Sequence, residues 1–124
     1  MESFSKVNLK HKFSLFDDQW SPKIVGELNG QFVKLAKVEG SFEWHAHDEE
    51  DELFMVIKGS LTIKLRQGDV TLGEGEFFIV PRGVEHKPVA EREAWILLFE
   101  PKETGHTGNI HTDRTVRVES QQWI

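Results

Sequence analysis

The chain has 124 residues with a hydrophobic content of 38%, a charged content of 29% and a formal net charge of −6. These values are typical of a soluble globular protein and exclude a disordered chain. An acidic surface has no general attraction for nucleic acid or for an anionic membrane, so we expect neither as a partner. The sequence has no cysteine, which excludes disulfides and thiolate metal sites and leaves nitrogen and oxygen to bind any metal.

The ends and the apolar runs of the sequence carry no targeting signal. Residues 1–13 have no apolar core long enough for a signal peptide, and the longest apolar run, residues 94–99, is far too short to span a membrane. We therefore expect a cytoplasmic protein. No Gly/Ser-rich linker, low-complexity segment or internal repeat marks a boundary, so we expect one domain over residues 1–124.

The chain consists of one short predicted strand after another. Residues 23–28 and 31–39 flank Asn29-Gly30, the dipeptide that most strongly indicates a two-residue hairpin turn. Gly59-Ser60 separates predicted strands 52–58 and 61–66 and indicates a second hairpin. Further strands are predicted at 70–72, 77–80, around 86, 94–99 and 115–119. The strand at 94–99 is apolar on both faces, so we expect it in the centre of a sheet.

No segment has a 3.6-residue apolar period over three turns. Many short strands with turn residues between them predict an all-β sandwich or barrel. A short helix near either end is compatible with the pattern.

Two histidines lie one step apart on a predicted strand. Side chains alternate across a strand, so His45 and His47 share a face, with Cβ atoms about 7 Å apart. Two imidazoles at that spacing can meet at one ion, and Glu52, a short loop later, can complete a set of two histidines and one carboxylate. His86 follows a Pro-x-Gly turn, where a barrel can bring it back to the same site. Three apolar residues are expected on the opposite face of this strand: Phe42, Trp44 and Ala46.

These residues resemble the two motifs of the cupin superfamily. The first motif is usually written G-x5-H-x-H-x3,4-E-x6-G, and here it runs from Gly40 through the two histidines and Glu52 to Gly59. The second, G-x5-P-x-G-x2-H-x3-N, runs from Gly75 through Pro81, Gly83 and His86 to Ala90. Fifteen residues, 60–74, separate the motifs, as in compact single-domain microbial cupins. The resemblance covers residues 33–99, which we take as the core of the barrel.

The sequence departs from these motifs at two points. Four residues instead of five separate Gly40 from His45, and Ala90 replaces the terminal Asn of the second motif. That Asn is not a metal ligand in the family, so its loss affects a turn or cavity contact. The resemblance implies an antiparallel double-stranded β-helix, or jelly-roll barrel, of the cupin type. Four side chains in one mouth of this barrel are implied to bind a divalent transition metal: His45, His47, Glu52 and His86.

The ligand set does not choose among metals. Imidazole and carboxylate suit Fe, Mn, Ni, Zn, Co or Cu, and we expect one such ion per chain. Four protein ligands leave one or two positions open on a five- or six-coordinate ion, which is what substrate binding needs.

Other side chains have both a structural and a functional interpretation. The acids at 48–51 form a solvated loop or, if the loop overhangs the mouth, favour a neutral or cationic substrate. Glu43 shares the predicted face of His45 and is a candidate partner of a ligand or a general base, or else a residue at the barrel mouth paired with a lysine. His11 is expected to be structural or exposed, and residues 106–111, with two histidines, to form a surface loop or to approach the mouth. Three residues, or their neighbours of opposite parity, are expected to line the cavity: Phe54, Phe77 and Ile79.

Two classes of function follow from this site. The first is a metal-dependent enzyme acting on a small molecule, of the dioxygenase, isomerase or decarboxylase class. The second is a module that binds a sugar or another small metabolite at the metal without turnover. A buried acid or base near the metal would favour the enzyme. The resemblance also implies a homodimer, since pairing or swapping strands would cover the edges of the barrel.

Overall fold

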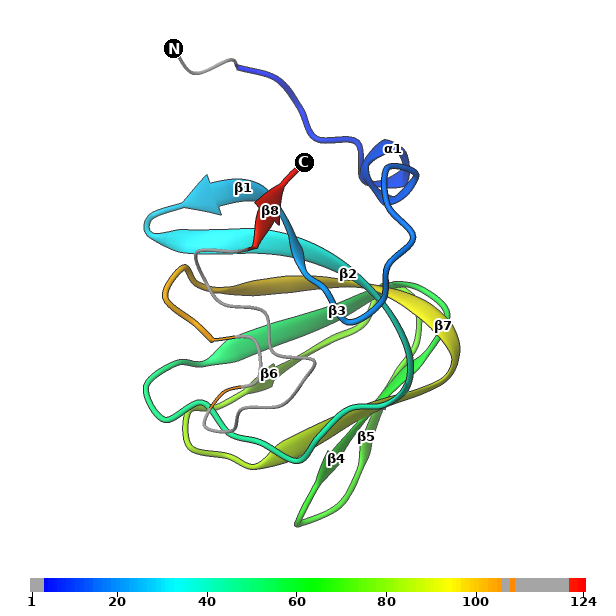
Figure 1. Cartoon of the computed structure of the whole chain (residues 1–124). Helices are drawn as coiled ribbons and strands as arrows, with labels where there is room; N and C mark the ends of the chain where they lie inside the picture. Colours follow the sequence, from blue (N-terminus) through cyan, green and yellow to red (C-terminus); the bar gives the residue numbers. More distant parts are fainter. Residues whose placement is uncertain (1–3, 106–107, 109–120) are drawn as a thin grey trace.

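The computed structural model describes residues 4–105, 108 and 121–124 (Figure 1). The predicted strand at 115–119, together with His106 and His111, lies outside the described residues. No described helix is long and apolar enough to cross a membrane. The described residues form one short helix and eight strands: α1 (Leu9–Phe13), β1 (Lys23–Leu28), β2 (Gln31–Ser41), β3 (Glu52–Lys58), β4 (Leu61–Leu65), β5 (Val70–Leu72), β6 (Phe77–Val80), β7 (His86–Pro101) and β8 (Gln122–Trp123).

The first predicted hairpin is confirmed. β1 and β2 pair antiparallel, with Leu28 opposite Gln31, and the turn residues Asn29 and Gly30 have φ of 52° and 78°. Positive φ at both central positions is the requirement of a type I′ turn, which explains the Asn-Gly dipeptide.

β7 is the central strand of the fold. It pairs with β2 along one edge and with β3 and β4 along the other, as the apolar segment 94–99 predicts. The sequence-based assignment of separate strands around 86 and at 94–99 was wrong, because one continuous strand of 16 residues covers both. The exposed charged residues at 91–93 lie where this strand bends across the molecule (Figure 1).

The second predicted hairpin was also wrong. β3 and β4 do not pair with each other; both run antiparallel to β7, β3 along Trp95–Phe99 and β4 along His86–Val89. Gly59 lies at the bend between them with a φ of 90°, and a Cβ there would stand 3.3 Å from the Ala94 backbone. Glycine is needed at this close approach, so the Gly-Ser pair marks a bend in a long ribbon and not a reversal.

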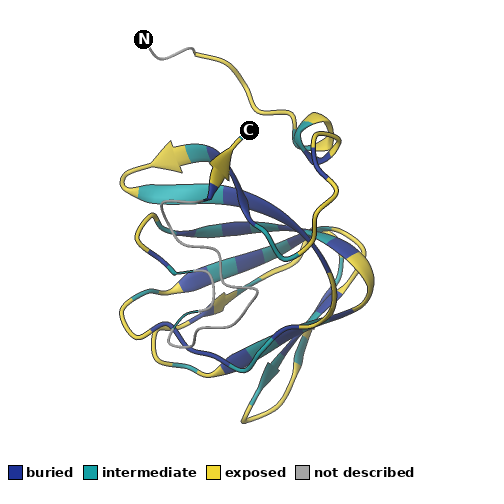
Figure 2. Cartoon of the chain, in the orientation of Figure 1, coloured by how far each residue is buried: buried dark blue, intermediate teal, exposed yellow. Residues whose placement is uncertain are grey.

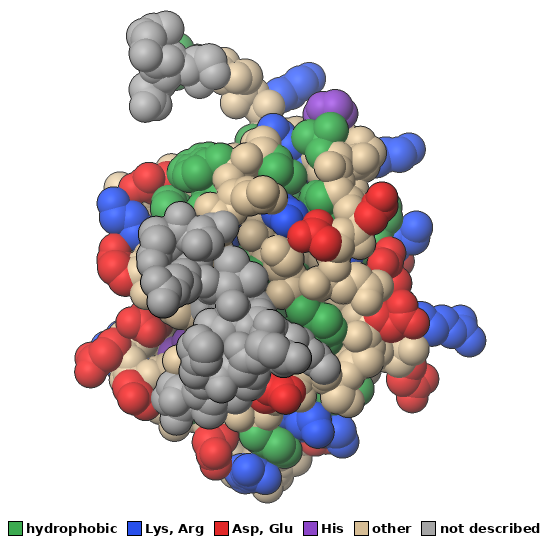
Figure 3. Space-filling model, in the orientation of Figure 1, with side chains coloured by type: hydrophobic (Ala, Val, Ile, Leu, Met, Phe, Trp, Pro, Cys, Tyr) green, Lys and Arg blue, Asp and Glu red, His purple; other side chains and the backbone are tan. Residues whose placement is uncertain are grey.

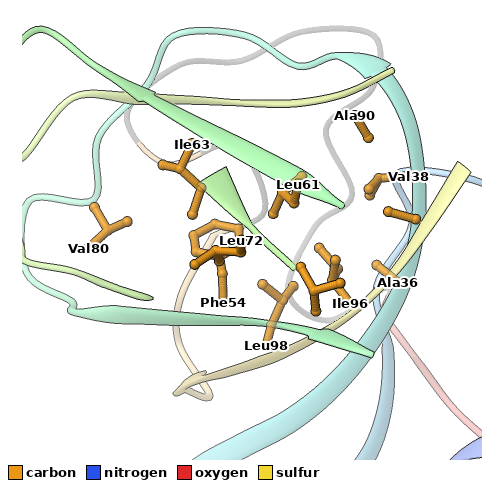
Figure 4. Close-up of a cluster of buried hydrophobic side chains, with 12 residues drawn as sticks. Ala36, Val38, Phe54, Leu61, Ile63, Leu72, Val80, Ala90, Ile96 and Leu98 are labelled. Carbon is orange, nitrogen blue, oxygen red and sulfur yellow. The ribbon is translucent and has the colours of Figure 1, made fainter. Parts of the chain in front are cut away.

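The barrel interior is filled by the inward residues of these strands. Figure 2 shows buried and less buried segments alternating along the strands, as expected for a sheet with one face toward a core. Figure 4 shows ten labelled side chains of this core pointing toward one another: Ala36, Val38, Phe54, Leu61, Ile63, Leu72, Val80, Ala90, Ile96 and Leu98. The all-β, jelly-roll type of barrel predicted from the sequence is therefore confirmed.

The sequence allowed either parity for β6, and the structure selects the one in which Phe78 and Val80 face inward. Phe77 and Ile79 are 57% and 49% exposed, whereas Val80 is in the core and Phe78 packs against it. Phe54 faces inward as predicted. The tetrapeptide is apolar at every position, so periodicity alone could not orient it.

Helix α1 and the segment after it cover part of the outer face of the sheet. Asn8 caps the helix by accepting a hydrogen bond from the His11 backbone NH at 2.9 Å, and His11 itself is exposed. Phe13 is fully buried and stacks on Trp95 of β7, with ring centroids 4.8 Å apart. A helix of five residues has little stability of its own, so this packing holds it in place.

Candidate metal centre

The four predicted ligands come together in the barrel interior from three separate segments. His45 and His47 lie in the connection between β2 and β3, Glu52 is the first residue of β3, and His86 is the first residue of β7. All four are buried, with exposed fractions of 4%, 4%, 6% and 0%. Their candidate ligand atoms lie within 4.8 Å of one another.

The backbone around the histidines differs from the predicted strand. Residues 42–47 form only an isolated antiparallel bridge, in which His45 NH donates to the His86 carbonyl at 3.0 Å and His86 NH donates back at 2.9 Å. The prediction that Phe42 faces away from the histidines was wrong: its ring lies 5.5 Å from that of His45, and both line one pocket. The reason is that the strict alternation of a pleated strand does not hold in this irregular segment.

The remaining backbone contacts fix the site to the turn before β7. The NH of Gly83 donates to the His47 carbonyl at 2.8 Å. Gly83 has a φ of 78°, which the Pro-x-Gly turn supplies without strain because glycine lacks a Cβ. These contacts explain how the second motif reaches the first across some forty residues of sequence.

The imidazole rings are oriented for coordination. His45 Nδ1 lies 2.9 Å from the Glu43 carbonyl oxygen, and His86 Nδ1 lies 3.0 Å from the Val84 carbonyl oxygen. A carbonyl only accepts, so each Nδ1 carries a proton, and Nε2 is the ring nitrogen left to bind a metal. Holding a ligating histidine through its other ring nitrogen is the usual arrangement in protein metal sites.

The polar atoms left over inside the cluster fit a cation. Glu52 Oε1 lies 3.2 Å from His47 Nε2 and 3.4 Å from His86 Nε2. These three atoms and His47 Nδ1 are buried without a hydrogen-bond partner. Unpaired buried polar atoms are costly, and converging ones are what a metal ion satisfies. Ligands about 2.1 Å from one ion lie at most about 4.2 Å apart, so small side-chain rotations bring this cluster to coordination spacing.

In the metal-free cluster, electrostatics favour the metal-binding protonation state of two residues, neutral His45 and ionised Glu52. Burial, together with the neighbouring His86, lowers the pKa of His45 to about 4 and keeps its imidazole neutral. Burial opposes ionisation of Glu52, but its contacts with His47 and His86 outweigh it and hold the pKa of Glu52 below its ordinary value. Burial likewise lowers the pKa of His47, but the Glu52 carboxylate outweighs it and raises that pKa overall.

Glu43 contributes its backbone to the site. Its carbonyl oxygen positions His45, while its half-buried carboxylate makes no hydrogen bond or ion pair with the described residues. A role for that carboxylate in proton transfer stays a prediction. In the acidic loop Asp48, Glu49 and Asp51 are exposed, as expected for a solvated segment, and Asp51 accepts a hydrogen bond from the Arg82 backbone NH at 2.8 Å. Figure 3 shows acidic and basic side chains intermixed over one face of the molecule.

A pocket opens beside the cluster. A cavity of about 40 Å³ lies between His45 and Glu52 and a mainly apolar wall that includes Phe54 and Leu98. This volume holds a few water molecules or one small substituent of a ligand, and it excludes a polymer. The same wall holds a buried ion pair that the sequence analysis missed, with Lys34 Nζ 3.7 Å from Glu100 Oε1.

Burial raises the pKa of Glu100 well above its ordinary value, and the nearby Glu52 carboxylate raises it further, whereas Lys34 and the Thr104 hydroxyl lower it. One signal could have found the pair from the sequence. Lys34 has the same parity as the apolar Ala36 and Val38 on a predicted strand, so its side chain had to face inward.

Comparison with known proteins gives one family. Residues 31–99 match the family model described as the cupin domain. A crystal structure of a cupin-2 domain-containing protein from Shewanella frigidimarina is similar, with 47% identity and a TM-score of 0.76, over 77% of this chain and 93% of that chain.

Two curated proteins match over shorter stretches. The uncharacterized protein YdbB of Bacillus subtilis is 33% identical over 64 residues, which are 51% of this chain and 57% of that protein. The 3-hydroxyanthranilate 3,4-dioxygenase of Ruegeria pomeroyi is 39% identical over 62 residues, which are 45% of this chain and 34% of the enzyme. The chain thus spans about half or less of the length of these curated relatives.

Proposed function

Because the chain belongs to the cupin superfamily, in which one barrel hosts many reactions, we propose from its site that it is a metal-dependent enzyme acting on a small molecule. The observation that carries this proposal is the convergence of four buried donor side chains, two of which, His45 and Glu52, line a pocket that also contains a second pair of ionisable groups. A buried acid or base near the metal is the feature that favours an enzyme over a binding module.

The residues present fit one divalent transition ion. His45 and His86 would bind through Nε2, Glu52 through a carboxylate oxygen and His47 through a ring nitrogen. The ion would supply Lewis-acid or oxygen-activating chemistry at its open positions. The protein's own contribution is to keep the imidazoles oriented through backbone carbonyls and to enclose the substrate between apolar walls.

Within the enzyme class we favour a dioxygenase. The support is the 39% identity to a 3-hydroxyanthranilate 3,4-dioxygenase over a stretch that covers 45% of this chain. The mainly apolar pocket wall also suits a flat, oxygen-bearing substrate. Isomerase and decarboxylase activities are the other two reaction types that the same ligand set supports.

The experiment that tests the proposal begins with the metal content of protein purified without a histidine tag, measured by inductively coupled plasma mass spectrometry. About one Fe, Mn or Ni per chain directs a screen for O2 consumption with catechols, diketones and thiols. Stoichiometric metal with no turnover of any substrate class would refute the enzyme and leave the non-catalytic binding module. Absence of metal after reconstitution would refute the site itself.

We also propose a homodimer formed through the outer face of β3 and β6. Leu53 pairs with Ile79 and Met55 with Phe77, so these four apolar side chains lie on one face. Phe77 and Ile79 are about half exposed, and within the described part of the chain β6 pairs with β3 alone. A twofold dimer would cover both the apolar face and the free strand edge.

A further inference from the structure

The inward-facing residues of β2 and β7 change from apolar to charged near the pocket. On β7 the inward residues Ala94, Ile96 and Leu98 are apolar, and the next inward position is Glu100. On β2 the inward Val38 and Ala36 are followed toward the same end by Lys34. The register places Lys34 opposite Leu98 and Glu100 opposite Phe32, so the two charged residues are diagonal neighbours inside the barrel.

The two charged groups are buried but are not tightly bound to each other. Lys34 is 1% exposed and Glu100 is 3% exposed. Their closest N–O separation is 3.7 Å, which is longer than a hydrogen bond. A buried ion pair stabilises a fold only when its geometry is good and its remaining hydrogen bonds are made. At this separation the two groups make no direct hydrogen bond to each other, so a third polar group can bridge them.

A third polar side chain lines the same pocket. Gln121, which precedes β8, is 8% exposed, and both its Nε2 and its Oε1 are buried without a hydrogen-bond partner. Buried amide groups are normally paired, so an unpaired amide beside a loose ion pair indicates that something else makes the hydrogen bonds.

Resting on the proposed function, we propose that Lys34, Glu100 and Gln121 form a polar subsite that binds an uncharged hydroxyl or carbonyl group of the substrate. Lys34 and the Gln121 amide supply donors, and Glu100 and the Gln121 carbonyl supply acceptors. A hydroxyl group can use both kinds of partner, whereas a carboxylate only accepts and would leave the acceptors of Glu100 and Gln121 unpaired.

The subsite lies next to the metal ligands. Glu52, one of the candidate ligands, and Glu100 line the same pocket. A substrate whose oxygens approach the ligand cluster therefore reaches the subsite with a neighbouring substituent. The substrate class is a small molecule with adjacent metal-chelating oxygens and a further neutral oxygen group beside them.

The test compares three probes by isothermal titration calorimetry, without oxygen, on full-length protein loaded with zinc. Catechol supplies two chelating oxygens, pyrogallol adds a neighbouring hydroxyl, and 2,3-dihydroxybenzoate adds a neighbouring carboxylate. We expect pyrogallol to bind about tenfold more tightly than catechol, as one added hydrogen bond predicts, and 2,3-dihydroxybenzoate to gain nothing.

Substitutions in the subsite test whether its residues cause the preference for pyrogallol over catechol. Lys34→Met and Gln121→Leu should each lower the affinity for pyrogallol more than that for catechol, so that the two affinities come close together. Lys37→Met is the matched control, because Lys37 is a buried lysine of the same strand that faces the outer side, with Nζ 2.6 Å from the Phe16 carbonyl oxygen.

Three results would overturn the subsite: no preference for pyrogallol in the wild type, a preference that survives both Lys34→Met and Gln121→Leu, or tighter binding of 2,3-dihydroxybenzoate than of pyrogallol. If Lys34→Met does not fold, Gln121→Leu decides, because Gln121 lies outside the barrel strands. A chain that holds no zinc and binds no probe refutes the proposed function together with the subsite. Catechol binding without a pyrogallol preference refutes the subsite alone.

Discussion

Replacing His86 by alanine separates metal binding from folding. His86 is fully buried, its Nδ1 is 3.0 Å from the Val84 carbonyl oxygen, and its Nε2 is 3.4 Å from Glu52 Oε1. The substitution removes both ring contacts. It keeps the two backbone hydrogen bonds that join residue 86 to His45, at 2.9 and 3.0 Å, so the register of the barrel is preserved.

The magnitudes follow from these contacts. Truncating a fully buried side chain of this size costs about 2–4 kcal/mol of folding free energy in the metal-free protein. For a chain of this length that lowers the melting temperature by on the order of 10 °C. Loss of a partner that only orients a ligand weakens metal binding about 10–100-fold, so loss of a ligand itself should weaken it by more than about 100-fold.

Metal content by mass spectrometry after dialysis and melting curves followed by circular dichroism measure the two effects separately. His11→Ala is the matched control, because His11 is exposed on α1 and should change neither quantity. His45→Ala and His47→Ala should lose metal in the same way. A folded His86→Ala protein that retains stoichiometric metal would show that the four donors do not form the site.

Three further predictions address stability and assembly. In metal-free protein the pKa of His45 is about 4 against 6.5 when unfolded, so between these values only the unfolded state takes up the proton, and up to about 3 kcal/mol should be lost as pH falls from 6.5 to 4. The free energy of unfolding, measured by urea titration at several pH values in this range, should depend less on pH for His45→Gln than for the wild type. An equal pH dependence in both proteins would contradict the assignment. Gly108→Ala should lower the melting temperature by several degrees, because φ is 61° and the added Cβ would collide with the Ala46 carbonyl; Gly105→Ala, whose Cβ would meet nothing closer than 3.9 Å, should be tolerated. Phe77→Glu should convert the proposed dimer to a monomer in light scattering, and a monomeric wild type would end that proposal.

Local sequence chemistry was enough to predict the type of fold and most of its strands. Asn29-Gly30 requires positive φ at both positions and so specified its hairpin without tertiary information. The spacing of the two motifs predicted that the four candidate ligands form one site. The described structure brings the same four residues together in space.

The sequence could not predict which strands pair or which side chains of a strand face the core. The Gly59-Ser60 dipeptide is compatible both with a hairpin turn and with a bend in a continuous ribbon. The structure shows the bend, because β3 and β4 both pair with β7. Phe77–Val80 is apolar throughout, so its parity depends on which side the core lies. The segment 42–47 lost its alternation because His45 pairs with the backbone of His86 instead of extending a regular strand.

The sequence by itself therefore determined which side chains can bind a metal, because ligand type and spacing are local properties of the chain. Only the tertiary structure decided what stands beside them. Lys34 and Glu100 are 66 positions apart and are unremarkable as single residues. They become a candidate subsite because β2 and β7 pair in a register that puts both charges on the inward face, at the pocket that contains Glu52.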